Sequence, residues 1–447
     1  MRTLVLRPVG LALALGVCPL ASAQAQLLSR YIPDYAPGLT ETPENTQARV
    51  QPEYRSDGVR AGSFVIRPRL AESLGYDSNV DGVQGGRASA AIDTQATVSA
   101  ESDWSRNSVA AQLSVDDQRY PARPVQDFTN WSAGLSGTYD VGLDQVSGSY
   151  QHLSVVQTPR DLGAVLSVPI PFQVDDVRIG TAFLTQGRLS FVPDLDVASY
   201  RFSNVVAPAG DGLNATLGQT WQSRLVYQPE LATRYELSPK RDVLLVLRGT
   251  VIDFTSHPAG VGNFNSVGGA VLAGFDYTGT GVFRYRALIG YQQRNYASAR
   301  FATIRSPIIE ASVTWKPQLM TTLTGIVRRE IDDSTNVNFI ATTVTSVQLN
   351  VAHELRRNVV LTGFGEYQRA DFGSGSGVGV SSGSAAGPGV SATTTPTQNI
   401  YSAGLGATWF LNRRTQLGVS YQFIDRSGGA QLSYLENVAL FTVGFGL

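Results

Sequence analysis

The sequence predicts an all-β protein: a transmembrane, antiparallel, up-and-down β-barrel with short periplasmic turns and longer extracellular loops. Three observations predict this fold. Apolar and polar residues alternate with a period of two along most of the chain, and the connectors between these segments alternate between short and long. No segment after the N-terminal region has the roughly 18 consecutive apolar residues of a membrane-spanning helix. The connectors separate about 18 strands, with 16 as the alternative count.

The composition fits strands that have one apolar and one polar face. Charged residues make up 16% of the 447 residues, and 45 residues are glycine. A typical soluble domain has about 25% charged residues and about 7% glycine. The mean hydropathy of −0.05 is the average expected when the two faces of each strand differ. The net charge of −1 provides no basic field, so nucleic acid is not an expected partner.

Residues 1–23 are predicted to be a secretory signal peptide. Two arginines precede a short apolar core, and small residues before Gln24 indicate cleavage at that point. The only cysteine, Cys18, lies inside this segment. It could be a lipoprotein attachment site, but the branched Val17 before it favours signal-peptide cleavage. The mature chain would then have no thiol, which suits an oxidising periplasm.

Residues 24–62 are predicted to be a periplasmic extension, and residues 63–447 the barrel. The extension is polar and has no strand periodicity, and prolines that cannot donate ladder hydrogen bonds interrupt it. These are Pro33, Pro37, Pro43 and Pro52. We favour a disordered lead-in over the alternative, a plug.

The strand pattern begins at Phe64 and is clear in the segment 283–294. One face of this segment is apolar, with Phe283, Tyr285, Ala287, Ile289 and Tyr291. The other face is polar, with Arg284, Arg286, Gln292 and Arg294. A helix would repeat its apolar residues every three or four positions instead. The pattern therefore predicts a strand with one side towards lipid and the other towards a lumen.

Aromatic residues cluster where strands end and predict two girdles at the headgroup level of the membrane. The expected periplasmic girdle consists of Trp104, Trp315, Trp409, Tyr139, Tyr235 and Tyr277. The expected outer girdle consists of Trp131, Tyr76, Tyr120, Tyr200 and Tyr296.

The C-terminal residues place Phe441, Val443, Phe445 and Leu447 on one face of a last strand. This pattern resembles the C-terminal assembly signal of outer-membrane barrels, although that signal usually ends in Phe rather than Leu. The resemblance implies the barrel-insertion machinery as a partner. Outer-membrane lipid is the other expected partner, and the outer membrane is the expected location.

Two stretches resemble the putative β-barrel porin type 2 family of outer-membrane proteins. One runs from Pro52-Glu53-Tyr54 through Gly58–Phe64 to Gly75-Tyr76-Asp77-Ser78-Asn79-Val80. The other is His152 with Thr158-Pro159-Arg160-Asp161 and Pro171. The resemblance extends from about residue 50 to the C-terminus and implies a barrel with a pore. It also implies an association with exopolysaccharide systems, and it brings no catalytic residues.

Two motifs have simpler interpretations than a binding site. The segment 77–82 matches the opening of an EF-hand calcium loop, but the twelfth position is Ala88 instead of Glu. Asx residues and glycine also form ordinary turns, so we expect no metal site there. The Gly/Ser-rich segment 373–391 has no lysine of a phosphate loop after it. We interpret it as a flexible outer loop, with a constriction inside the lumen as the alternative.

No arrangement of residues in the sequence indicates an enzyme. The chain has three histidines, His152, His257 and His353, and no spacing joins them to a serine or a carboxylate. We therefore predict no catalytic residues, no metal and no cofactor.

The best functional clue is the charge on the predicted inward faces. The candidate pore-lining residues are Arg67, Arg69, Arg284, Arg286, Arg328, Asp93, Glu101, Glu310, Glu330 and Glu366. An Arg or Lys that faces lipid near the midplane costs about 2–4 kcal/mol, whereas opposed charges in a wet lumen select solutes. Paired charges could instead fill a plugged barrel. We favour a wet lumen because barrels of about 16–18 strands normally leave a channel.

These observations predict porin-like passage of polar solutes through a charged lumen. The first alternative, a component of surface polysaccharide export, rests on the family resemblance. The second is a structural or adhesive barrel without a pore.

Overall fold

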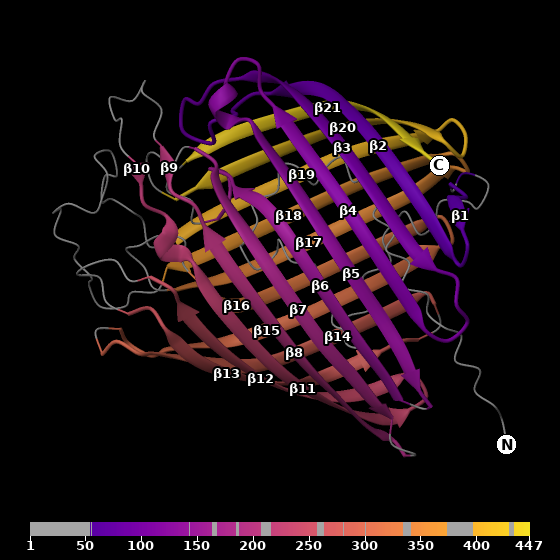
Figure 1. Cartoon of the computed structure of the whole chain (residues 1–447), viewed down its shortest axis with the longest axis vertical. Coiled ribbons are helices and arrows are strands. Elements are labelled where there is room, and N and C mark those ends of the chain that lie inside the picture. Colours follow the sequence, from indigo (N-terminus) through magenta and orange to yellow (C-terminus); the bar gives the residue numbers. More distant parts are fainter. Residues whose placement is uncertain are drawn as a thin grey trace.

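Eighteen long strands form one closed antiparallel barrel (Figure 1) in this computed structural model. The structure describes residues 54, 56–142, 144–162, 168–184, 187–206, 216–256, 263–279, 281–299, 301–333, 341–372, 397–428 and 433–447. The predicted signal peptide lies outside the described residues, as do residues 24–53 and residue 55 of the predicted extension. The predicted fold class and the strand number of about 18 are confirmed.

The wall strands are 12 to 16 residues long, as tilted membrane-spanning strands should be. In chain order they are β2 (Phe64–Asp77), β3 (Ser89–Ser102), β4 (Ser108–Arg119), β5 (Phe128–Val141), β6 (Asp144–Gln157), β7 (Ile170–Leu184), β8 (Leu189–Phe202), β11 (Arg224–Ser238), β12 (Arg241–Phe254), β13 (Ser266–Tyr277), β14 (Phe283–Tyr296), β15 (Ile304–Gln318), β16 (Thr321–Asp333), β17 (Ala341–Arg356), β18 (Val359–Phe372), β19 (Thr397–Phe410), β20 (Thr415–Ser427) and β21 (Tyr434–Gly446).

Each wall strand pairs with the next one along the chain, and β21 pairs with β2 to close the ring. The closing ladder runs from Arg69↔Gly446 to Asp77↔Val438. A short strand β1 (Val59–Ala61) forms a hairpin with β2. Strands β9 (Val205–Val206) and β10 (Thr216–Leu217) form a small hairpin in the connection from β8 to β11. The closed ring leaves no unpaired sheet edge along the first and last strands.

Connectors at one end of the barrel are short, and those at the other end are long. The two-residue turns after Ser238 and Gln318 are among the short ones, and the segment between β18 and β19 is the longest of the long ones. Outer-membrane barrels have their short turns in the periplasm. We therefore assign the short-turn end, where Figure 1 shows β1 and the C-terminus, to the periplasm.

The helical elements in the described ranges are two 3-10 turns. These are η5 (Pro124–Gln126) and η7 (Thr220–Gln222), and both lie in long-loop connections. In the part of the chain that the structure describes, no helix is long and apolar enough to cross a membrane.

The two faces of each strand differ in exposure as the period-two pattern requires. On β2, Leu74 and Tyr76 are more than half exposed, whereas Ser73 and Asp77 are buried. So many large apolar side chains would be costly in contact with water, so the face that exposes them is the outer one, in contact with lipid. The opposite face points inward.

The aromatic girdles are present, with three corrections at the outer end. Trp104, Trp315, Trp409, Tyr139, Tyr235, Trp131 and Tyr76 are exposed on the outer surface near strand ends. Tyr120 and Tyr200 are instead buried inside, and Tyr296 lies on the inward face against Phe301. Chain position alone predicts an outer-girdle place for these residues, but Tyr200 shares its strand face with the inward Ala198 and Phe202.

Two hairpins bend into the barrel at the long-loop end. The β5–β6 ladder stops at Trp131↔Ser154, and the next residues of β6, Val155–Gln157, are buried on both faces. The β15–β16 ladder stops at Ile309↔Arg329, and beyond it Ile331 is buried. The paired end of β17 is buried too, at Ala341 and Thr342. Burial on both faces of a strand means that each hairpin has moved inward from the wall.

Candidate functional site

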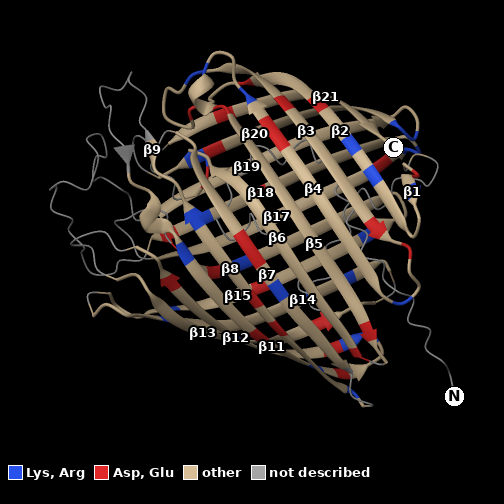
Figure 2. Ribbon diagram, viewed as in Figure 1, with Lys and Arg blue, Asp and Glu red and all other residues tan. Residues whose placement is uncertain are grey.

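All ten predicted pore-lining residues lie on the inward faces of their strands. They are Arg67, Arg69, Asp93, Glu101, Arg284, Arg286, Glu310, Arg328, Glu330 and Glu366, on β2, β3, β14, β15, β16 and β18. Charged positions occur along the whole length of the strands as well as in the loops (Figure 2). Alternation alone explains why the ten residues face inward, because residues two apart on a strand point the same way.

Arg67 and Glu101 form the pair nearest to the periplasmic end of β2 and β3. Arg67 Nη1 donates to Glu101 Oε2 over 2.9 Å, and the two side chains stay 28% and 23% exposed. Because both groups still reach solvent, their mutual attraction is screened and the pair lines an accessible space.

A second set of charged side chains spans the inner wall from β11 to β15. Arg248 Nε lies 2.7 Å from Glu230 Oε2, and Arg248 Nη1 lies 2.7 Å from Glu310 Oε1. Arg248 is on β12 and Glu310 is on β15, so their side chains extend over β13 and β14, which lie between these strands. The residues beneath, including Ala270 and Leu272, are buried. The charged groups therefore cover an apolar part of the wall.

Other charged side chains on the inward faces also form ion pairs. Arg178 Nε lies 2.7 Å from a carboxylate oxygen of Asp196, across β7 and β8. At the end of β16, the carboxylate of Asp333 pairs with two arginines: Arg224 Nε lies 2.8 Å from Oδ2, and Arg294 Nη1 lies 2.7 Å from Oδ1. These residues were not among the predicted ones, although the same alternation could have identified Arg178 and Asp196.

Two predicted residues are buried in the inner wall. Asp93 is fully buried and accepts a hydrogen bond from Gln95 Nε2 over 2.9 Å. Glu366 is buried and accepts one from Gln368 Nε2 over 2.6 Å. They face inward, but they are part of the wall packing rather than open to a central space.

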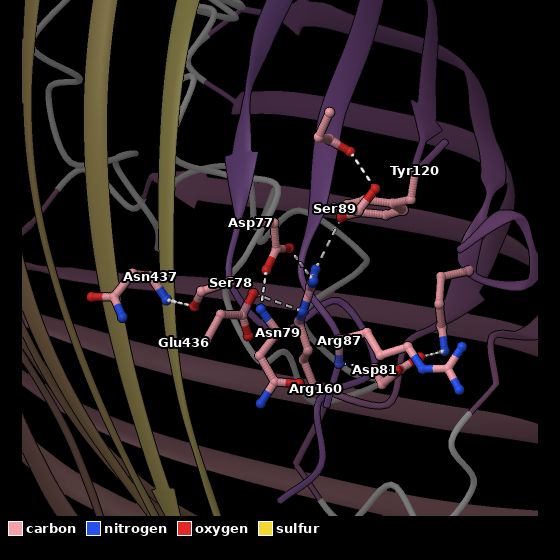
Figure 3. A network of polar contacts seen from close by, with 12 residues as sticks. Asp77, Ser78, Asn79, Asp81, Arg87, Ser89, Tyr120, Arg160, Glu436 and Asn437 are labelled. Atoms are coloured by element: carbon pink, nitrogen blue, oxygen red, sulfur yellow. Dashed lines mark hydrogen bonds and ion pairs between the residues drawn. The ribbon is translucent and has the colours of Figure 1, made fainter. Parts of the chain in front are cut away.

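The outer mouth is crossed by the segment 158–162, which follows β6. The guanidinium of Arg160 pairs with Asp77 on β2, and its Nε lies 3.0 Å from Glu436 Oε1 on β21. Figure 3 shows the Arg160 side chain pointing towards both carboxylates. Arg426 of β20 donates from Nη1 to the carbonyl oxygen of Pro159 over 2.8 Å. The segment is thus held against the strands that close the barrel.

Burial and charge act in opposite directions on Arg160. Burial alone would lower the pKa of its guanidinium, but the carboxylates of Asp77 and Glu436 raise that pKa above its ordinary value. Arg160 Nη1 also donates to the Tyr120 hydroxyl over 3.2 Å. Burial raises the pKa of Tyr120 to about 12. Both groups therefore keep their protons at neutral pH, and the bridge carries a permanent positive charge between two acids.

Apolar packing supports the same crossing. Leu162 belongs to a buried cluster with Tyr120 and with inward residues of β17 to β21. Among them are Val344, Phe372, Ile400 and Ile424. The segment after β6 thus contacts strands on a distant part of the ring.

The EF-hand match at 77–82 has its carboxylates occupied by arginines. Asp77 pairs with Arg160, and Asp81 Oδ1 lies 2.6 Å from Arg123 Nη2. Asp77 Oδ1 also accepts from the backbone N–H of Asn79 over 2.9 Å, which forms an Asx turn. Within the described ranges, no group of three or more His, Cys, Asp or Glu side chains could hold a metal ion.

The two histidines that the structure describes, His152 and His353, lie on different strands of the wall. His152 Nδ1 is 2.7 Å from Asp175 Oδ1 on the outward face, where Asp175 also receives Tyr150 and Arg201. His353 Nδ1 is 2.9 Å from Thr321 Oγ1 near the periplasmic end. His257 lies outside the described residues. The expectation of no catalytic site stays a prediction.

A closed barrel of 18 strands, with an apolar outer surface and a charged inner face, is an outer-membrane β-barrel. The family model described as "Putative beta-barrel porin 2" matches residues 51–445. The chain therefore belongs to this porin family, and its location is the outer membrane.

Solved outer-membrane barrels have a similar fold at low sequence identity. OccK2 (OpdF) of Pseudomonas aeruginosa is 12% identical, with a TM-score of 0.44 over 86% of this chain and 98% of that one. OpdK of the same organism is 9% identical, with a TM-score of 0.43 and the same coverage. The FrpB iron transporter of Neisseria meningitidis is 8% identical, with a TM-score of 0.43 over 83% of this chain and 62% of that one. No curated protein sequence matches the chain.

Proposed function

We propose that the protein is a porin-like pathway for polar solutes through a charged lumen, without covalent chemistry. The observation that carries the proposal is the pair Arg67–Glu101, which is ion-paired on the inward face yet still partly exposed. A barrel of about 18 strands is wide enough for an aqueous channel. Fixed charges on its wall would then select among polar solutes.

The bridge at the outer mouth would be the narrow part of this pathway. Arg160 is held between two carboxylates, so its position is fixed and its charge is compensated. Selectivity for a charged solute would therefore depend more on the inward charges below the bridge. Arg284 and Arg286 are the clearest of these, because they are two apart on β14 and point to the same side.

Conductance in a planar bilayer tests the proposal. The parent should show stable open steps, and the variant Arg284→Glu/Arg286→Glu should shift the reversal potential in a salt gradient towards cation preference. Fixed negative charge in a narrow wet pore concentrates cations. The control Arg201→Glu/Arg369→Glu makes the same change of charge on the outward face and should leave the reversal potential unchanged.

Two results would contradict this proposal. A reversal potential that does not move in a conducting channel would show that Arg284 and Arg286 do not act on the ions in the path. A silent but folded barrel would favour a plugged or partner-gated role, such as surface polysaccharide export, over a porin.

A further inference from the structure

The wall of the barrel has a break between β15 and β16 at the outer end. The ladder runs up to Ile309↔Arg329 and stops, although both strands continue. Two residues further along each strand, Pro307 would face Ile331. Pro307 has no N–H to donate at this position, so the ladder cannot continue there. Pro307 thus removes one possible ladder hydrogen bond where the break begins.

Side chains, rather than a neighbouring strand, satisfy the free backbone groups of β16. The N–H of Ile331 donates to Gln292 Oε1 over 3.0 Å, and Arg294 Nη2 donates to the carbonyl oxygen of Ile331 over 3.3 Å. Gln292 and Arg294 are inward residues of β14, so they reach past β15 to do this. Ser306, Ile308 and Ile331 are buried as a result, and the break is closed.

An apolar row on the inward face leads to the break. Register pairs align the row across six neighbouring strands from β8 to β15. The next strand of the wall, β16, is not paired with β15 at this level. The members of the row are Val192, Ala232, Val246, Leu272, Gly290 and Ile308. The five side chains that carry a Cβ are all buried. This apolar row, which the Arg248–Glu310 pair covers at Leu272, would suit an acyl chain better than a polar solute once that cover moves aside.

The outer surface beside the break has the character of a membrane interface with a basic charge. On β14 the exposed apolar residues end at Tyr291, which pairs with Pro307, and polar Gln293 follows. The break therefore begins at the headgroup level. Arg305 and Arg329 flank it on the outward face and contact Gln293 and Thr345, at 3.2 and 2.6 Å.

Neither flanking arginine has a carboxylate partner among the residues that the structure describes. The other break, between β5 and β6, differs in this respect, because the outward Arg119 beside it is paired with Asp117. A basic residue near a membrane surface attracts anionic lipid headgroups. The uncompensated charge therefore points to a ligand with an acyl chain and an anionic group.

We propose that the break between β15 and β16 is a lateral opening that accepts the acyl chain of an anionic amphiphile from the outer leaflet. Arg305 and Arg329 bind the anionic group, and the chain reaches Ile308 and the apolar row when Gln292 and Arg294 release Ile331. This site is separate from the axial path for polar solutes. It would give the barrel a second route, between its inner wall and the membrane.

Quenching by nitroxide-labelled lipid tests whether acyl chains reach the break. In a Cys18→Ser background, which removes the only cysteine, Ile308→Cys carries a bimane label in vesicles containing nitroxide phosphatidylglycerol. Leu272→Cys is the matched control, because it lies in the same buried row with ladders on both sides. We expect clearly stronger quenching at residue 308. Equal quenching at the two sites would overturn the proposal.

Pro307→Val tests the cause of the break, because valine restores the N–H. Quenching at residue 308 should then fall to the level of the Leu272→Cys control. Pro229→Val, in β11, should leave it unchanged, since the β11–β12 ladder resumes on both sides of that proline. Persistent strong quenching in Pro307→Val would contradict the assignment of the break to this residue.

Lipid retention in native mass spectrometry uses the protein without a label. The variant Arg305→Gln/Arg329→Gln should retain less phosphatidylglycerol than the parent, by about fivefold for each arginine. Arg201→Gln/Arg369→Gln removes two outward arginines that are paired with carboxylates and should retain as much as the parent. Equal retention by all three proteins would refute the anionic site.

Discussion

At the scale of single residues, Arg160 connects parts of the chain that are far apart in sequence. It lies in the segment after β6, yet it binds Asp77 at the end of the first wall strand and Glu436 near the start of the last. All three side chains are buried. Two buried acids would repel one another without the guanidinium, so the arginine makes their burial tolerable. The family resemblance included both the 77–80 and the 158–161 stretches, and this contact gives a physical reason for their joint presence.

Replacing Arg160 should therefore destabilise the barrel and open its mouth. Arg160→Gln leaves two buried carboxylates without a cation, which should lower the free energy of unfolding by about 3–5 kcal/mol. Urea unfolding in lipid vesicles measures this loss, and single-channel conductance should rise as the segment 158–162 leaves the wall.

Two comparisons make the Arg160 prediction specific. Arg201→Gln breaks an exposed pair with Asp175 and should cost only about 0.2–1 kcal/mol. Adding Asp77→Asn and Glu436→Gln to Arg160→Gln should recover much of the lost stability, because none of the three charges of the bridge then remains. If the triple variant is no more stable than Arg160→Gln, charge compensation is not what the bridge provides.

At the scale of elements, the strands meet the requirements of pairing in different ways. Pro307 lies just beyond the point where the β15–β16 ladder stops, whereas Gly290 allows β13 and β14 to approach closely. A Cβ at Gly290 would lie 2.1 Å from the carbonyl oxygen of Val271, which backbone cannot accommodate without moving. At positions such as these, the residue type, and not the apolar pattern, decides the local geometry.

A pair of glycine variants should show this difference between strands. Gly290→Ala should lower the free energy of unfolding by about 1–3 kcal/mol or more, because the wall must shift. Gly365→Ala on β18, where a Cβ would meet nothing within 4 Å, should be neutral or slightly stabilising. Heat-modified mobility in detergent gels and urea midpoints measure both variants. Similar losses of stability in the two variants would show that strand propensity, and not the close contact at Gly290, dominates the effect.

At the scale of the whole molecule, the parity of the connectors sets the orientation. Eighteen strands return the chain to the end where it started, so both ends of the barrel sequence lie at the short-turn side. The inward charges and the bridge would line the proposed axial path, and the break at β15–β16 would add a lateral one. The two routes depend on different residues, so each can be altered without the other.

The orientation predicts where the longest loop lies. The segment between β18 and β19, residues 373–396, lies outside the described residues, and its glycine-rich sequence suits an outer loop. An epitope inserted near Gly387 should be detected by antibody on intact cells without loss of folding. Detection only after permeabilisation would reverse the orientation.

The amino-acid sequence by itself determined the class of fold, the strand number and the inward direction of the ten predicted charges. These depend on a period of two and on connector length, which are local properties of the chain. Only the tertiary structure decided which charges meet, because Arg160 and Glu436 are 276 positions apart and Arg248 reaches Glu310 across two intervening strands. It also decided that Tyr120 and Tyr200 are buried and that the β16–β17 hairpin bends inward. Such contacts depend on how the ring closes and where a ladder stops, and no local pattern contains that information.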